Sequence, residues 1–141
     1  MQYLVSIALA VVCNMVLGFL WYGPFFGRQW LQALGWSEKE LAKRKAKGMG
    51  MVYALTTAGA VVTAVMLSAV IRWYGAPSVG AGIAVGFFVW LGFILPISAQ
   101  SVLFEGRNNT AFWIGVGYQL AALMLTGAIL ALGQPARFVF Y

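Results

Sequence analysis

The sequence predicts an all-α fold, an integral membrane bundle of four transmembrane helices, and three observations support this. Hydrophobic residues make up 62% of the 141 residues and charged residues only 9%, whereas a soluble domain carries about a quarter. Four runs contain no charged residue: 1–27, 48–71, 73–104 and 108–136. Each run is long enough for one crossing, which takes roughly 20 residues, and too short for two. Helix is expected in every run because a lone spanning segment must bond its own backbone amides.

The first helix is expected over residues 3–22. The chain begins without the basic side chain and the cleavage site of a secretory signal peptide, so we expect this run to remain in the protein. Pro24 pushes the residue before it out of the helical region, and we therefore expect Gly23-Pro24 to stop the helix. The segment LGFLWYGPFFGRQW (17–30) is rich in aromatic residues. We interpret it as an aromatic belt at the headgroup level, with a ligand pocket as the alternative. The belt includes Trp21, Tyr22 and Trp30.

The connection at 23–50 is basic. Ser37 and Glu40 are spaced as in a capping box, which predicts a short helix over 36–48. Its cations are candidates for holding anionic lipid headgroups, each worth about 1 kcal/mol near the surface. They are Lys39, Lys43, Arg44, Lys45 and Lys47. A simple solvated helix is the alternative. We expect no nucleic-acid partner, because a basic cluster beside a span has this simpler explanation.

The basic residues lie mostly on one side of the predicted helices. Seven of the nine Lys and Arg residues fall in the first and third connections, and the other two are Arg72 and Arg137. Short loops rich in Lys and Arg remain in the cytoplasm. Residues 23–50 are therefore predicted to be cytoplasmic, and both termini to lie outside.

The other three helices are expected over 51–73, 79–103 and 111–132, which completes one domain over 1–141. Small residues recur every four positions on two of these helices, and small residues let helices approach closely in lipid. The stripe on the second helix is Thr56, Ala60, Ala64 and Ser68. The stripe on the third helix is Ser78, Gly82 and Gly86. We predict a homo-oligomer with the third-helix stripe at the contact; packing of the two stripes inside one subunit is the alternative.

The chain has no His and no Asp, and its acids are Glu38, Glu40 and Glu105. We therefore predict no catalytic residue, no metal site, no cofactor and no enzyme activity. The remaining candidates are polar side chains within or beside the spans: Asn14, Gln100, Glu105, Arg107 and Gln119. Asn14 is expected to face inward beside Gly18 and to bond another helix. Glu105 is expected to pair with Arg107 or with the basic connection.

A weak internal sequence repeat suggests two related helical hairpins. Leu17-Gly18-Phe19 precedes Pro24, and Leu91-Gly92-Phe93 precedes Pro96. Because the first and third helices run in the same direction, a duplication would relate them by an axis along the membrane normal. Chance similarity between apolar sequences is the alternative.

Two patterns, NMVLGFLWYGPFFGRQW (14–30) and LFEGRNNTAFWIGVGYQL (103–120), resemble the family catalogued as domain of unknown function 1761. The resemblance covers nearly the whole chain. It implies a small multi-pass protein of the bacterial inner membrane and implies no activity. Two classes of function are therefore expected. The first is an oligomeric structural or interaction unit. The second is a small channel or carrier for a neutral or anionic solute, lined by Asn14, Gln100 and Gln119.

Overall fold

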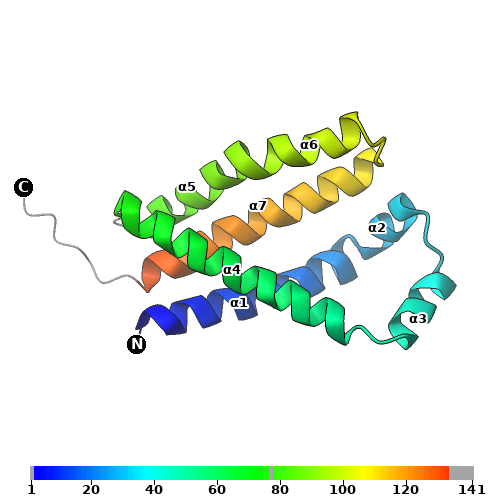
Figure 1. Ribbon diagram of the computed structural model, residues 1–141, viewed down its shortest axis with the longest axis horizontal. Helices are drawn as coiled ribbons and strands as arrows, with labels where there is room; N and C mark the ends of the chain where they lie inside the picture. Colours follow the sequence, from blue (N-terminus) through cyan, green and yellow to red (C-terminus); the bar gives the residue numbers. More distant parts are fainter. Residues whose placement is uncertain (1, 77, 134–141) are drawn as a thin grey trace, which may run out of the picture.

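A computed structural model describes residues 2–76 and 78–133, and its regular elements within these ranges are all helices. Figure 1 shows their arrangement. The first part contains α1 (Gln2–Leu20), the π-helical segment η1 (Trp21–Phe25), α2 (Gly27–Leu34), α3 (Glu38–Ala46) and α4 (Gly50–Tyr74). The second part contains α5 (Val79–Val89), the π-helical segment η2 (Trp90–Ile94), α6 (Leu95–Leu103) and α7 (Asn109–Leu132).

Four helices are long and apolar enough to cross a membrane, which fits a multi-pass membrane protein. They are Gln2–Phe25, Gly50–Tyr74, Val79–Leu103 and Asn109–Leu132. The all-helical prediction with four such helices is confirmed. Three of the four predicted ranges match to within two residues at each end, because the charges and turn residues between the runs mark the helix limits. Gly75 illustrates this, since α4 ends where Gly75 takes a left-handed conformation (φ 69°).

The first helix does not stop at Gly23-Pro24, so that prediction is wrong. The helix continues to Phe25 because the backbone widens into a π-helical turn around Pro24. There the N–H of Phe26 donates to the carbonyl of Trp21, five residues earlier, at 2.9 Å. A wider turn accommodates the proline, which has no N–H and would clash with the preceding turn of a regular α-helix. The helical path breaks at Phe26, just before α2.

The connection that follows contains two short helices. α2, which the sequence analysis did not predict, contacts α7 and η1. α3 begins with the predicted capping box: the Glu40 N–H donates to Ser37 Oγ at 3.2 Å, and the Ser37 N–H donates to the Glu40 carboxylate at 2.9 Å. The basic residues of α3 are exposed.

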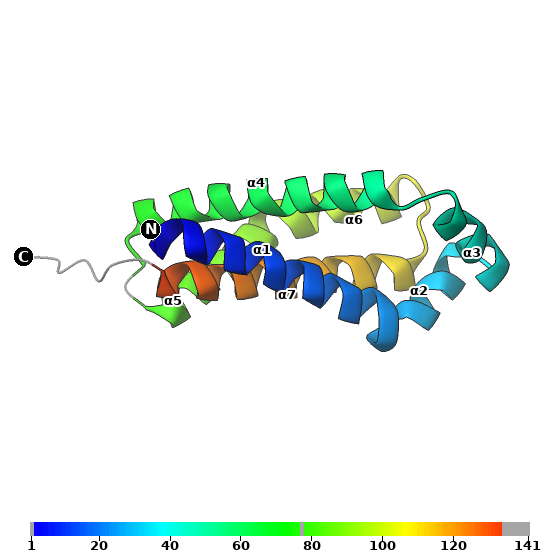
Figure 2. The same cartoon turned by 90° about the horizontal axis from the view of Figure 1, so that it is seen from below.

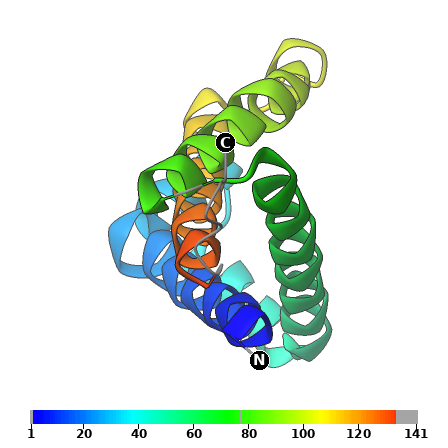
Figure 3. The same cartoon turned by 90° about the vertical axis from the view of Figure 1, so that its left-hand side faces the viewer.

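α7 is the central helix of the bundle. It contacts α1 on one side and α5 on another, as Figures 1 and 3 show. Of the four long helices it has the largest buried share. α4 contacts α1, α7 and α5. It crosses α1 and α7 in Figure 1 and lies to one side of them in Figure 2.

The small residues of α5 allow it to lie directly on α7. A Cβ added at Gly82 would meet the carbonyl oxygen of Gly127, and one at Gly86 would meet that of Leu123. The predicted oligomer contact at Gly82 and Gly86 is therefore wrong, because α7 of the same chain occupies that face. Ser78, at the exposed start of α5, caps the helix by accepting the Ala81 N–H at 3.2 Å. The sequence showed that α5 permits close approach, but it did not show which helix approaches.

One half of α4 packs in the bundle and the other half does not. Ala64 and Ser68 are fully buried, and Ser68 Oγ lies 2.7 Å from the Tyr3 hydroxyl of α1. Towards the start of α4, Thr56 and Leu55 are exposed. Figure 3 shows α4 and α6 diverging from the turn that connects α4 to α5. The starting half of α4 is therefore loosely packed, since the buried residues of this helix all lie at Ala64 and beyond.

Candidate functional site

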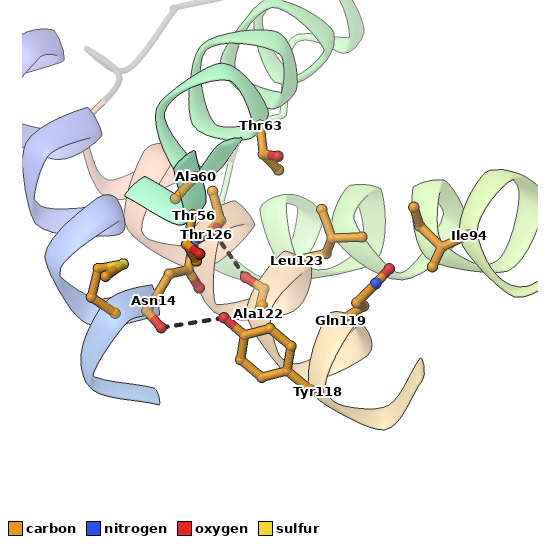
Figure 4. Close-up of a pocket in the computed structure, with 11 residues that line it drawn as sticks. Asn14, Thr56, Ala60, Thr63, Ile94, Tyr118, Gln119, Ala122, Leu123 and Thr126 are labelled. Carbon is orange, nitrogen blue, oxygen red and sulfur yellow. Dashed lines mark hydrogen bonds between the residues drawn. The ribbon is translucent and has the colours of Figure 1, made fainter. Parts of the chain in front are cut away.

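A cavity of about 290 Å³ lies between α1, α4, η2 and α7 (Figure 4). Its wall combines apolar residues with polar residues from three helices. The polar ones are Asn14, Thr56, Thr63, Tyr118, Gln119 and Thr126. All of them come from helices long and apolar enough to cross a membrane. Polar side chains placed there need partners, because lipid offers none.

Asn14 is the most constrained of these residues and is only 6% exposed. Its Nδ2 donates to Thr126 Oγ1 at 2.7 Å, and the Thr126 hydroxyl donates to the carbonyl of Ala122 at 2.8 Å. The expected bond from Asn14 to another helix is therefore present. Oδ1 of Asn14 is also buried but has no hydrogen-bond partner among the described residues. Leaving such an acceptor unpaired costs about 1–3 kcal/mol.

Tyr118 lines the cavity and was not among the predicted site residues. Its hydroxyl donates to the backbone carbonyl of Asn14 at 3.4 Å (Figure 4). The same hydroxyl lies where a Cβ at Gly18 would be 3.2 Å away, so Gly18 lies beside Asn14 as expected. The available sequence signal was a tyrosine in the middle of a span, next to Gln119 and far from either predicted interface.

Four aromatic residues of the segment 17–30 pack together and contact Tyr118 of the cavity wall, whereas Phe19 and Phe25 are exposed. The ring of Tyr22 lies 4.9 Å from that of Trp30 and 5.2 Å from that of Tyr118. The ring of Trp21 lies 4.8 Å from that of Phe26. Tilted and edge-on pairs of this kind stabilise a fixed arrangement. These rings therefore contact one another and α7, which an aromatic belt alone does not require.

The remaining predicted site residues lie elsewhere. Gln119 is in the cavity wall, but Gln100 is exposed on α6 and is not part of the wall. Pro24 is exposed in η1. Arg107 Nε donates to Glu105 Oε2 at 3.1 Å in the loop before α7. This exposed ion pair is the first of the two alternatives for Glu105, and it is worth about 0–1 kcal/mol.

A second, smaller hollow of about 180 Å³ lies on α3 and is lined by Trp36, Glu40, Lys43 and Arg44. The Arg44 guanidinium stacks over the Trp36 ring at 4.1 Å. This contact orders one cation of the basic cluster.

Comparison with protein families gives one finding. Residues 5–131 match the family model described as "Protein of unknown function (DUF1761)", which covers nearly the whole chain and confirms the resemblance. Neither the curated proteins nor the solved structures contain a match to the chain.

Proposed function

Because the chain belongs to the DUF1761 family, which has no assigned function, we propose a function from the cavity: the protein binds a small solute between its membrane-spanning helices, as a carrier does. The observation that carries the proposal is that Asn14, which lines the cavity, has a buried Oδ1 with no hydrogen-bond partner among the described residues. A bound hydrogen-bond donor recovers the free energy lost by burying this acceptor. Polar residues inside a membrane are costly, and they commonly mark the path of a solute.

The arrangement of the helices supports a carrier. α1, α5 and α7 form the tightly packed part, in which glycines bring α5 and α7 into backbone contact. The starting half of α4 is the less packed wall of the cavity. In this proposal α4 moves while the other three helices hold the site, as in carriers that rock one part against another. Asn14 and Gln119 line the site as expected, and Gln100 does not.

The oligomeric interaction unit is the weaker of the two expected functions. The favoured contact of this unit was the small-residue stripe of α5, and α7 covers Gly82 and Gly86 of that stripe. No equivalent surface on α4 has a specific feature that identifies a second copy as its partner. The carrier is therefore the function that the geometry favours.

The proposed setting is the inner membrane of a bacterium, with residues 23–50 in the cytoplasm and both termini outside. Its support is the bias of Lys and Arg towards the first and third connections. In this orientation α3 lies at the cytoplasmic surface, where its cations meet anionic headgroups. Those cations are Lys39, Lys43, Arg44, Lys45 and Lys47.

Native mass spectrometry of the protein, purified from its membrane in mild detergent, tests the proposal. We expect the wild type to retain a small molecule that Thr63→Phe lacks, because Thr63 lines the cavity (Figure 4). Val62→Phe is the matched control, since Val62 is the next residue of α4 and is 59% exposed. It should retain the molecule. If wild type and Thr63→Phe carry the same set of bound molecules, solute binding in this cavity is wrong.

A further inference from the structure

We infer that the ligand is a neutral amphiphile whose hydroxyl or amide N–H donates a hydrogen bond to Oδ1 of Asn14, and that it enters from the bilayer between α4 and η2. This inference rests on the proposed function and deepens it, because it names the ligand class and the entry path.

Charge argues for a neutral ligand. The residues of the cavity wall are uncharged, and the wall is formed by four helical segments that belong to membrane spans. A charged ligand would lose its hydration there without gaining an opposite charge, which is unfavourable. The anionic solute that the sequence left open is therefore disfavoured at this site.

The hydrogen bonds argue for a ligand that donates. Three donors beside Asn14 already have protein acceptors: Asn14 Nδ2 donates to Thr126, the Thr126 hydroxyl donates to Ala122, and the Tyr118 hydroxyl donates to the carbonyl of Asn14. The donors of Thr63 and Gln119 are on exposed residues of the wall, away from this buried group. Oδ1 of Asn14 accepts no hydrogen bond from the described residues. An ether or a ketone can only accept, so it leaves this oxygen unpaired, whereas an alcohol or an amide pairs with it.

The size and lining of the cavity argue for an apolar body on this ligand. A volume of about 290 Å³ has room for on the order of ten non-hydrogen atoms at roughly 30 Å³ each. Beyond the polar groups, the wall is formed by Met15, Ala60, Ile94, Ala122 and Leu123. These residues complement an alkyl chain rather than a polyhydroxylated solute.

The cavity opens towards the side of the bundle, between α4 and η2. The two wall segments α4 and η2 belong to helices that diverge towards the start of α4 and the end of α6 (Figure 3). Thr56 and Thr63, on the α4 side, are exposed. A molecule dissolved in the bilayer reaches Asn14 through this opening without crossing the tightly packed contact of α5 with α7.

Four compounds with ten non-hydrogen atoms each test the inference on the purified protein: nonan-1-ol, methyl octyl ether, nonylammonium and octanoate. The measurement is the Tm of wild type, Asn14→Leu and Thr126→Val. Both variants lose the bond between Asn14 and Thr126, but Thr126→Val keeps Oδ1. We expect nonan-1-ol alone to raise the Tm saturably, by about 3 °C or more, in wild type and Thr126→Val but not in Asn14→Leu.

The other outcomes separate this inference from the proposed function. An equal rise with methyl octyl ether would overturn the requirement for a donor, and a rise with octanoate would overturn the requirement for neutrality. If no compound raises the Tm, the ligand class is wrong. In that case the native mass spectra decide the proposed function, which stands if wild type retains a molecule that Thr63→Phe lacks and otherwise fails with the inference.

Discussion

Trp21 and Trp90 bind the same helix through the same kind of hydrogen bond. The indole N–H of Trp21 donates to the carbonyl of Ile114 at 3.0 Å, and that of Trp90 donates to the carbonyl of Val116 at 2.8 Å. Each tryptophan is the first residue of a π-helical segment, η1 or η2. The two acceptors lie two residues apart on α7, so both tryptophans bond the same turn of the central helix. π-helical turns are frequent at functional sites, and Ile94, the last residue of η2, lines the cavity.

We predict that Trp90→Phe lowers the free energy of unfolding by about 1–2 kcal/mol, because the hydrogen bond is lost and the smaller ring fills less of a buried site. The bond is buried, and Trp90 is 8% exposed. Denaturation in mixed micelles of mild detergent and dodecyl sulfate measures the effect. The control is Trp113→Phe, at a tryptophan of α7 that is 60% exposed. Equal losses in the two variants would show that the bond to Val116 contributes nothing specific.

We predict that Gly82→Ala destabilises the single subunit by about 1–3 kcal/mol, since its Cβ must push α5 away from the backbone of Gly127. Gly80→Ala is the matched control on the same helix. A Cβ at Gly80 lies 3.9 Å from Ser78 Oγ, which is ordinary contact. Alanine is the better helix former by up to about 1 kcal/mol, so this control should be neutral or stabilising. If Gly82→Ala changes the oligomeric mass and leaves the unfolding curve unchanged, the contact lies between copies after all.

The sequence predicts the four helices well, because the charge-free runs and the turn residues between them are local signals. It predicts helix partners poorly. Gly82 and Gly86 showed that another helix could approach the backbone of α5 closely. That helix could equally have been α7 of the same chain or a helix of a second copy. The prediction that Gly23-Pro24 stops the first helix was wrong for a related reason. A π-helical turn that tolerates proline depends on how Trp21 and its neighbours pack against α7.

The cavity was predictable only in part. Asn14 and Gln119 were identified because amides are conspicuous in an apolar span, whereas Tyr118 resembled the many aromatic residues around it. The internal repeat stays a prediction. The sequence aligned Leu17-Gly18-Phe19 with Leu91-Gly92-Phe93, whereas the feature that the two helices share in the structure is a tryptophan, Trp21 or Trp90, that begins a π-helical segment and donates to a carbonyl of α7. A single sequence does not show these hydrogen bonds.

The predicted orientation can be tested with single cysteines in a Cys13→Ala background. A membrane-impermeant maleimide should label Lys43→Cys only after the cells are permeabilised, because the basic connection is expected in the cytoplasm. Ser78→Cys, in the exposed turn between α4 and α5, should be labelled in intact cells and serves as the control. Labelling of Lys43→Cys in intact cells, with Ser78→Cys protected, would reverse the topology.

The proposed lipid contact of α3 predicts a loss of anionic lipid when its cations are neutralised. Each cation near the surface is worth about 1 kcal/mol, or about fivefold in affinity. Lys43→Gln combined with Arg44→Gln should therefore lower the retention of phosphatidylglycerol by more than tenfold in native mass spectra, and leave phosphatidylcholine unchanged. Arg107→Gln is the control, because Arg107 is already paired with Glu105. Equal lipid retention in the double variant and the wild type would make α3 a simple solvated helix.

The bond between Asn14 and Thr126 predicts a measurable coupling between α1 and α7. Asn14→Leu should lower the Tm in detergent, since it removes a buried bond of 2.7 Å. Thr126→Val should lower it at least as much, because it leaves the buried Nδ2 of Asn14 without an acceptor, whereas Asn14→Leu removes that donor. A double-mutant cycle in unfolding free energy should give a coupling of about 0.6–2 kcal/mol, the range for hydrogen bonds between helices in membranes. Part of the loss in Asn14→Leu is offset, because the substitution also removes the unpaired Oδ1. A coupling near zero would mean that the two side chains stabilise the bundle independently, and an unchanged Tm in Asn14→Leu would mean that the amide is not needed for stability.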